Sequence, residues 1–204
     1  AFYALGAVYV RRLGMDLSET AWFMSIVILG GVALQWPLGR LSDRFDRRRV
    51  IVVAFAGTFV TCIALSLMTG PGLAFLLLGA LFGGLSFALY PLCVAHTNDH
   101  LDPDQRVAAS GGLVLLYSVG AVAGPMAGAV AMTLLGPAGL FAFIGLCASG
   151  SLAFGVWRQA RAMPVPTDQQ QNYQILPRTT PMSAALDPLA TEGAEPREKP
   201  WQTS

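Results

Sequence analysis

Charged residues are scarce in this sequence and are placed unevenly. Asp, Glu, Lys and Arg make up 12% of the 204 residues, whereas a soluble domain typically contains about 25%. None of them occurs in residues 20–38, 50–97 or 107–157. About 20 apolar residues cross a bilayer, so the first stretch fits one span and each of the others fits two. Helices without a charged face are poorly suited to water, which excludes an ordinary soluble core.

Cysteine is also rare, and no catalytic or metal-binding pattern is recognisable. The three cysteines, Cys62, Cys93 and Cys147, all lie in apolar stretches, and their number and spacing match no disulfide or metal site. We interpret them as small buried or lipid-facing side chains. There is no Ser/His/Asp set and no phosphate-binding glycine loop, so the sequence indicates neither an enzyme nor a cofactor. A net charge of +1 indicates no nucleic-acid partner.

Turn residues divide the apolar stretches into six expected helices. Gly70–Gly72 and Gly136–Pro137 are the clearest breaks, Ser18 is a candidate N-cap, and Asp102, Pro103 and Gln105 are typical of a helix start. The expected helices are 1–10, 19–38, 50–68, 73–95, 103–135 and 138–157. At about 1.5 Å per residue the first covers roughly half of the hydrocarbon core, so we interpret it as part of a span whose upstream portion is missing.

The end of the chain has a different composition. Residues 164–204 hold seven of the thirteen prolines, few large apolar residues and mixed charge. Such a segment buries too little surface to offset its chain entropy. We therefore predict two units, a six-helix transmembrane domain at 1–157 and a disordered tail at 158–204.

The arginines predict the orientation, because basic residues collect on the cytoplasmic side of spans. On one expected side lie Arg106, Arg158, Arg161 and five arginines at 40, 44, 47, 48 and 49. The turns on the other side carry no basic residue, and Arg11 and Arg12 alone disagree. We predict a cytoplasmic basic side and a cytoplasmic tail.

The segment between the second and third expected helices carries a motif. It reads PLGRLSDRFDRRRV over 37–50 and resembles the signature loop of the major facilitator superfamily, G-x-L-[GAS]-D-R-x-G-R-[RK]. Asp46 stands where the family usually has Gly, and Asp tolerates a left-handed conformation better than most residues. The resemblance implies an all-α integral membrane fold, here the six-helix C-terminal half of a transporter.

By the same resemblance, the loop acts as a latch that closes the cytoplasmic side in one transport state. The latch residues would be Gly39, Asp43, Arg44, Arg47 and Arg48. We expect Asp43 just past a helix end, near the positive N-terminus of another helix, and arginines that pair with a carboxylate across the interface between halves. The alternative is that the arginines only set topology.

The fifth expected helix carries a second pattern, at Gly111, Gly120, Gly124, Pro125 and Gly128. It resembles a motif found in some members of the superfamily, with Ala129 in place of the final Gly. A face without side chains lets another helix approach closely, and Pro125 permits a bend. An ordinary packing seam is equally compatible with it.

Three further segments, 2–6, 34–49 and 90–100, resemble YcaD-type bacterial transporters of this superfamily. The family's arrangement suggests cavity-lining roles for Tyr3, Gln35, Ser86, Tyr90 and Tyr117. The alternatives are helix-to-helix hydrogen bonding for Gln35 and interfacial anchoring for the tyrosines, particularly Tyr9 beside Arg11.

The polar segment after the fourth expected helix suggests a gate. His96, Asn98 and Asp99 could hydrogen-bond across the loops in one conformation only, whereas their spacing lacks a known metal-ligand pattern. The leading hypothesis is alternating-access transport of a small solute across a bacterial inner membrane, with the lipid bilayer and an N-terminal six-helix half as partners. A multi-pass scaffold or partner subunit is the alternative.

Overall fold

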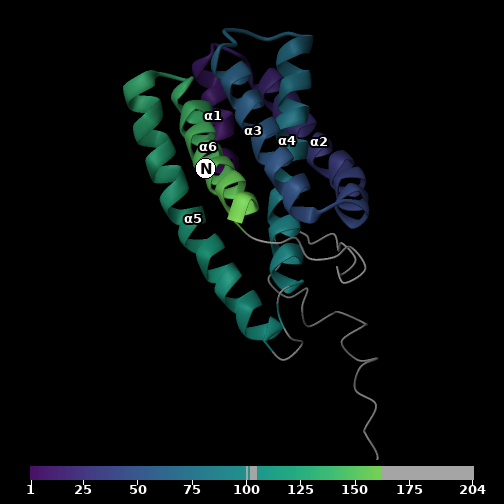
Figure 1. The fold of residues 1–204 in the computed structure, drawn as a ribbon. Helices are drawn as coiled ribbons and strands as arrows, with labels where there is room; N and C mark the ends of the chain where they lie inside the picture. The colour runs from purple at the N-terminus through teal and green to yellow at the C-terminus, as the bar shows by residue number, and fades with distance from the viewer. Residues whose placement is uncertain (100, 102–104, 162–204) are drawn as a thin grey trace, which may run out of the picture.

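The computed structural model describes residues 1–99, 101 and 105–161, and these residues form six α-helices without a strand (Figure 1). The helices are α1 (Phe2–Arg12), α2 (Leu17–Arg44), α3 (Arg47–Ser66), α4 (Leu73–Asn98), α5 (Arg106–Leu135) and α6 (Gly139–Arg161). Five of them, α2 to α6, are long and apolar enough to cross a membrane. The all-α membrane fold expected from the uncharged stretches is therefore confirmed. The predicted tail lies outside the described residues from 162 onward.

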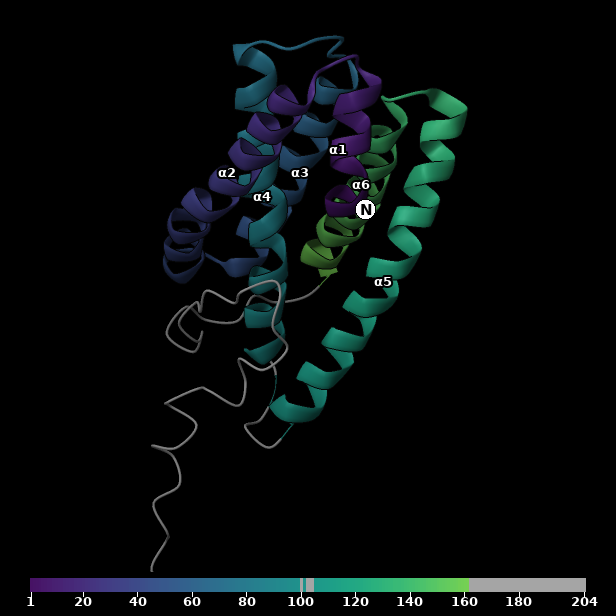
Figure 2. The ribbon, with the colours of Figure 1, turned by 180° about the vertical axis from the view of Figure 1, so that it is seen from behind.

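The helix ends lie at the two ends of the bundle in the arrangement that the positions of the arginines predict. The α2–α3 junction, the end of α4, the start of α5 and the end of α6 lie at one end of the bundle, the lower end in Figure 1, seen from behind in Figure 2. We call this the basic end, because it carries the five arginines between positions 40 and 49 together with Arg158 and Arg161. The connections at 67–72 and 136–138 lie at the opposite end.

The two arginines that disagree with this pattern bind backbone carbonyls at the opposite end. Arg11 donates from Nη1 to the backbone oxygen of Met15 at 3.2 Å. Arg12 donates from Nη1 to the backbone oxygen of Met132 at 3.2 Å, in the last turn of α5. The last carbonyls of a helix lack an intrahelical partner, so Arg12 satisfies one of them and ties α1 to α5.

Glycines let α2 and α4 approach at backbone distance. A Cβ on Gly83 would overlap the backbone oxygen of Val27, and a Cβ on Gly30 would overlap the backbone oxygen of Ala80. Both helices run in the same direction from the opposite end toward the basic end (Figure 1). No other residue type permits this contact, which is the packing mode of small residues between spans.

Aromatic rings fix the opposite end of the bundle. Phe23 of α2 stacks on Phe75 of α4 with centroids 4.3 Å apart, and Tyr9 of α1 meets Phe141 of α6 edge-on at 4.8 Å. The Tyr9 hydroxyl donates to the backbone oxygen of Leu65 in α3 at 3.0 Å. The interpretation of Tyr9 as an interfacial anchor was wrong, because its side chain is fully buried and its hydroxyl finds a partner inside the bundle.

Several helix ends differ from the expected ones. α2 begins at Leu17 because Asp16, and not Ser18, caps it: Asp16 Oδ1 accepts from the Glu19 N–H at 2.7 Å, and Glu19 Oε2 accepts from the Asp16 N–H at 2.9 Å. Reciprocal bonding of this kind stabilises a helix start. α4 continues to Asn98 and α6 to Arg161, past the expected ends at 95 and 157. The predicted cap at Asp102 and Pro103 lies outside the described residues.

The expected loop at 39–49 is almost entirely helical. α2 continues through Arg44 and α3 begins at Arg47, so only Phe45 and Asp46 lie between them. Asp46 has a φ of −51°, so the left-handed conformation suggested for it was wrong. Its carboxylate instead caps α3 by accepting the Arg48 N–H at 3.0 Å, a role that Gly cannot perform through a side chain.

Candidate functional site

A buried cluster of three charged side chains lies at the basic end. Arg47 donates from Nη1 to Asp99 Oδ2 at 2.7 Å and from Nη2 to Asp43 Oδ1 at 3.1 Å. The side chains of Arg47 and Asp99 are each 1% exposed, whereas that of Asp43 is 31% exposed. The guanidinium fork thus joins two carboxylates from different helices with charge-assisted bonds. We call Asp43, Arg47 and Asp99 the charge cluster.

Local structure explains how three helices deliver these residues to one place. Asp43 lies in the last turn of α2 and Arg47 is the first residue of α3, so the two-residue junction sets them one turn apart. Asp99 caps α4, where its N–H donates to the backbone oxygen of Ala95 at 3.1 Å. Asp43 was expected beyond the helix end, and this was wrong, because α2 extends past it.

Forming the charge cluster requires an unfavourable free energy of desolvation, and breaking it inside the bundle is also unfavourable. Withdrawing Arg47 and Asp99 from water is unfavourable by several kcal/mol per ion, which only close, well-bonded geometry offsets. Removing Arg47 or Asp99 leaves an uncompensated charge inside the bundle. The complete cluster forms only in a state that brings all three helix ends together.

The other predicted latch residues have different surroundings. Gly39 is buried, and its carbonyl accepts the Ser42 hydroxyl at 2.9 Å. Arg44 is exposed on the last turn of α2, and Arg48 is half-buried at the start of α3. The structure brings two predicted latch residues, Asp43 and Arg47, together with Asp99 from the predicted gate, which the sequence interpretation had kept as a separate set. The carboxylates that pair with Arg47 in the described chain belong to the same six helices, whereas a carboxylate across the interface between halves was expected.

The other two predicted gate residues precede Asp99 on α4. His96 and Asn98 are half-buried. The Oδ1 atom of Asn98 is buried without a hydrogen-bond partner among the described residues. Within the same part of the chain, no group of three or more His, Cys, Asp or Glu could hold a metal ion.

Candidate cavity residues from three helices form two ring pairs. Tyr3 of α1 stacks on Phe87 of α4 with centroids 5.2 Å apart, and Tyr90 of α4 lies 5.2 Å from Tyr117 of α5. Ser86 is the neighbour of Phe87 in the chain. We call Tyr3, Ser86, Phe87, Tyr90 and Tyr117 the tyrosine face.

The remaining cavity candidate lies on α2. Phe87 packs against Gly31, where a Cβ would overlap the phenyl ring. Gln35 follows Gly31 by one helical turn and therefore shares its side of α2. Its side chain is half-buried. Gln35 therefore lies on the side of α2 that packs against Phe87, and we do not include it in the tyrosine face.

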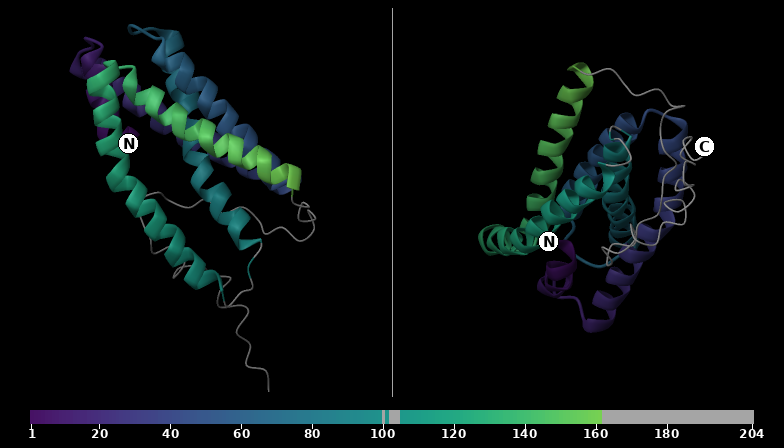
Figure 3. Two further views of the ribbon diagram at one scale, coloured as in Figure 1. Left: turned by 60° about the vertical axis from the view of Figure 1, so that its left-hand side comes forward. Right: turned by 90° about the horizontal axis from the view of Figure 1, so that it is seen from below.

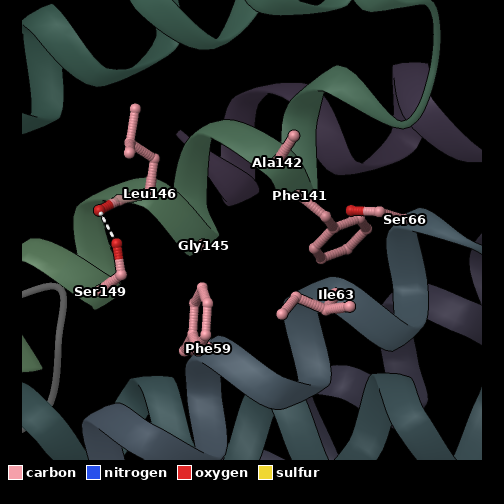
Figure 4. Close-up of a pocket in the computed structure, with 8 residues that line it drawn as sticks. All are labelled: Phe59, Ile63, Ser66, Phe141, Ala142, Gly145, Leu146 and Ser149. Atoms are coloured by element: carbon pink, nitrogen blue, oxygen red, sulfur yellow. Dashed lines mark hydrogen bonds between the residues drawn. The ribbon is translucent and has the colours of Figure 1, made fainter.

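A separate hollow of about 210 Å³ lies between α3 and α6 (Figure 4). It is lined by Phe59, Ile63, Ser66, Phe141, Ala142, Gly145, Leu146 and Ser149. Both serine hydroxyls bond within their own helices, from Ser66 to the Cys62 oxygen and from Ser149 to the Leu146 oxygen, each at 2.8 Å. No motif or residue pattern indicated this apolar hollow, and none of the candidate site residues lines it.

The glycine motif of α5 is only partly packed. A Cβ on Gly128 would lie 2.9 Å from Leu5 Cδ1, and one on Gly124 would lie 3.3 Å from the Ala1 nitrogen. Nothing lies within 4 Å of a Cβ built on Gly111 or Gly120. Pro125 lies inside the helix, within the packed region between Gly124 and Gly128. In the described chain, therefore, the motif meets α1 at one end, while α5 stays at the edge of the bundle (Figure 3).

The comparisons with known proteins agree with the motif at 37–50. The sequence model described as Major Facilitator Superfamily matches residues 1–201. Among curated proteins, the chain is 32% identical over 125 residues to the uncharacterized MFS-type transporter YcaD of Escherichia fergusonii, covering 61% of this chain and 32% of that protein. It is 31% identical over 132 residues to proteins of the same name from Salmonella paratyphi B and Salmonella newport, covering 65% of this chain and 34% of each. The matched segment thus spans about a third of the length of these relatives.

Proposed function

Since the chain belongs to the major facilitator superfamily, we propose that it is part of a secondary transporter that moves a small solute by alternating access. The observation that carries this proposal is the charge cluster. A static membrane scaffold has no need of an arginine and an aspartate that are both 1% exposed, because apolar side chains of the same size stabilise a bundle equally well or better. A cluster that forms only when α2, α3 and α4 meet can bias one of two conformations.

The charge cluster would hold the basic end closed in one transport state. Movement of these helix ends breaks the bonds of Arg47 and admits water, which solvates the separated charges. The closed and open states then differ by a modest free energy, as a reversible transporter requires. The reaction involves no covalent chemistry and no cofactor.

The proposed partner is an N-terminal six-helix half that covers α5. Large apolar side chains of α5 are exposed in the described chain: Leu115, Leu116, Val119, Val122, Met126, Val130, Leu134 and Leu135. Several of them face lipid equally well, but the open glycines at 111 and 120 favour a helix that approaches the backbone closely. The solute would pass between the two halves.

Replacing Asp43 by Asn in the full-length protein should slow uptake several-fold while the protein reaches the membrane in normal amounts. Asn keeps a hydrogen-bond acceptor for Arg47 but removes the charge, so the closed state loses stability. Initial uptake rates in everted vesicles, for a solute identified by screening, measure the effect. The matched control is Asp16→Asn at the opposite end, which preserves the helix cap. Equal rates in both variants would leave the arginines with only a topological role.

We propose that the chain lies in a bacterial inner membrane with the basic end in the cytoplasm, and labelling tests this. In a full-length protein without native cysteines, Phe45→Cys at the basic end should react with an impermeant maleimide only after the cells are opened. Pro71→Cys at the opposite end should react in intact cells. Both positions are exposed, and basic residues retain their segment on the cytoplasmic side. The reverse labelling pattern would contradict the orientation.

A further inference from the structure

The tyrosine face presents aromatic rings at a depth where a membrane protein seldom exposes hydroxyls. Tyr90 lies about two turns before α4 ends at Asn98, and Tyr117 lies about three turns after α5 begins at Arg106. Tyr117 is 41% exposed and Tyr3 is 51% exposed in the described chain. Tyrosine facing lipid is concentrated at the membrane interface, so rings at this depth favour contact with water, protein or a solute.

The face contrasts with the hollow between α3 and α6. In the hollow, both serine hydroxyls bond to their own helices and the walls are otherwise apolar, which suits a lipid chain. On the tyrosine face, phenol rings from α1, α4 and α5 are held in position by the Tyr3–Phe87 stack and the Tyr90–Tyr117 pair. Rings with restricted freedom provide a preorganised stacking surface.

The absence of charged residues around the tyrosine face restricts the kind of solute that the face can bind. No Asp, Glu, Lys or Arg occurs in residues 1–10, 73–95 or 107–135, which are the parts of α1, α4 and α5 that surround the rings. A charged group placed against this face would find no counter-ion on it, and burying an unpaired charge is unfavourable by several kcal/mol. Hydroxyls of Ser and Tyr can nevertheless both donate and accept hydrogen bonds.

We infer that the tyrosine face binds the flat ring of an uncharged, ring-bearing solute. The ring stacks on Tyr3, Tyr90 and Tyr117, and its polar substituents hydrogen-bond to the phenol hydroxyls of these tyrosines. Aromatic stacking and edge contacts of this type favour rings over aliphatic chains. The inference rests on the proposed transport function and deepens it by naming the class of solute.

A thermal-stabilisation screen of the purified full-length protein tests this class. The probes are uridine and phenyl β-glucoside as uncharged ring compounds, glycerol and urea as uncharged compounds without a ring, benzoate as an aromatic anion, and tetraphenylphosphonium as an aromatic cation. We expect stabilisation by an uncharged ring compound and by none of the others. Stabilisation by the other sets alone, or by no probe, would overturn the inference.

Variants of Tyr117 locate the binding. Tyr117→Leu should weaken the affinity for the stabilising compound roughly five- to tenfold through loss of stacking, and Tyr117→Phe should weaken it less, because the ring remains. The control is Leu116→Ala, an exposed neighbour on α5 that does not belong to the face. Equal affinities in Tyr117→Leu and Leu116→Ala would place the compound elsewhere and overturn the inference.

The proposed function can fail separately from this inference. Slowed transport in Asp43→Asn, combined with stabilisation only by charged or ringless probes, would retain the transporter and reject the solute class. Ring-dependent binding through Tyr117, combined with unchanged transport in Asp43→Asn, would support the solute class and reject the latch.

Discussion

Replacing Arg47 by Met should lower the free energy of unfolding by about 3–5 kcal/mol, since removing one partner of a buried ion pair leaves an uncompensated charge. The stranded charge is the carboxylate of Asp99, whose side chain is 1% exposed. Asp43 is 31% exposed and is solvated more easily. Thermal unfolding of the purified full-length protein in detergent, together with its yield in the membrane, measures the loss.

Two further variants show whether the loss comes from the stranded carboxylate. Replacing Asp99 by Leu in the Arg47→Met background should recover much of the stability, because the buried charge is then removed on both sides. Arg44→Met is the matched control, since Arg44 is exposed on the neighbouring turn and exposed substitutions usually change stability by less than about 0.5 kcal/mol. If Arg47→Met were as stable as Arg44→Met, the charge cluster would have no structural importance.

Replacing Gly83 by Leu should prevent stable folding of the α2–α4 pair and remove most of the protein from the membrane. The first added atom, Cβ, would overlap the backbone oxygen of Val27, and backbone cannot move aside as a flexible side chain can. Overpacking a tight contact costs about 1–3 kcal/mol and occasionally more. Here α2 and α4 must separate along the contact, so we expect the upper part of that range or beyond. Membrane yield and thermal stability report the effect.

A glycine in open space provides the control for Gly83→Leu. Gly150 lies on α6, and nothing lies within 4 Å of a Cβ built on it. Gly150→Leu should leave yield and stability nearly unchanged, because Leu also has a higher helix propensity than Gly. Similar losses in both variants would show that the close contact of α2 and α4 has no special importance.

The charge cluster could be predicted from the sequence only in part. Asp43 and Arg47 belong to one motif, and the resemblance of that motif to the family's signature loop suggested a shared role. Asp99 was recognised only as a polar residue in a separate segment, because it lies 52 positions after Arg47 and the sequence between them carries no information on which helix ends meet. The opposite charges were the one available signal, and they did not single out Asp99 among the other polar residues of its segment.

Glycines illustrate the same limit. The motif of α5 was read as a closely packed face, yet a Cβ on Gly111 or Gly120 meets nothing within 4 Å in the described chain. Gly83 on α4, in contrast, lies directly against the backbone of Val27. A glycine in a helix is compatible with close packing, but the rotation and register of the neighbouring helix decide whether that packing occurs.

The sequence alone determined that the chain is a bundle of membrane-spanning helices with a basic end. Uncharged runs of sufficient length and clusters of arginine are local properties, and a bilayer acts on them one segment at a time. Only the tertiary structure decided that Arg47 pairs with Asp99, that Tyr3 pairs with Phe87 and Tyr90 with Tyr117, and that Tyr9 is buried. These contacts join residues far apart in the chain, and they depend on how the helices rotate and fit against one another, which no local pattern specifies.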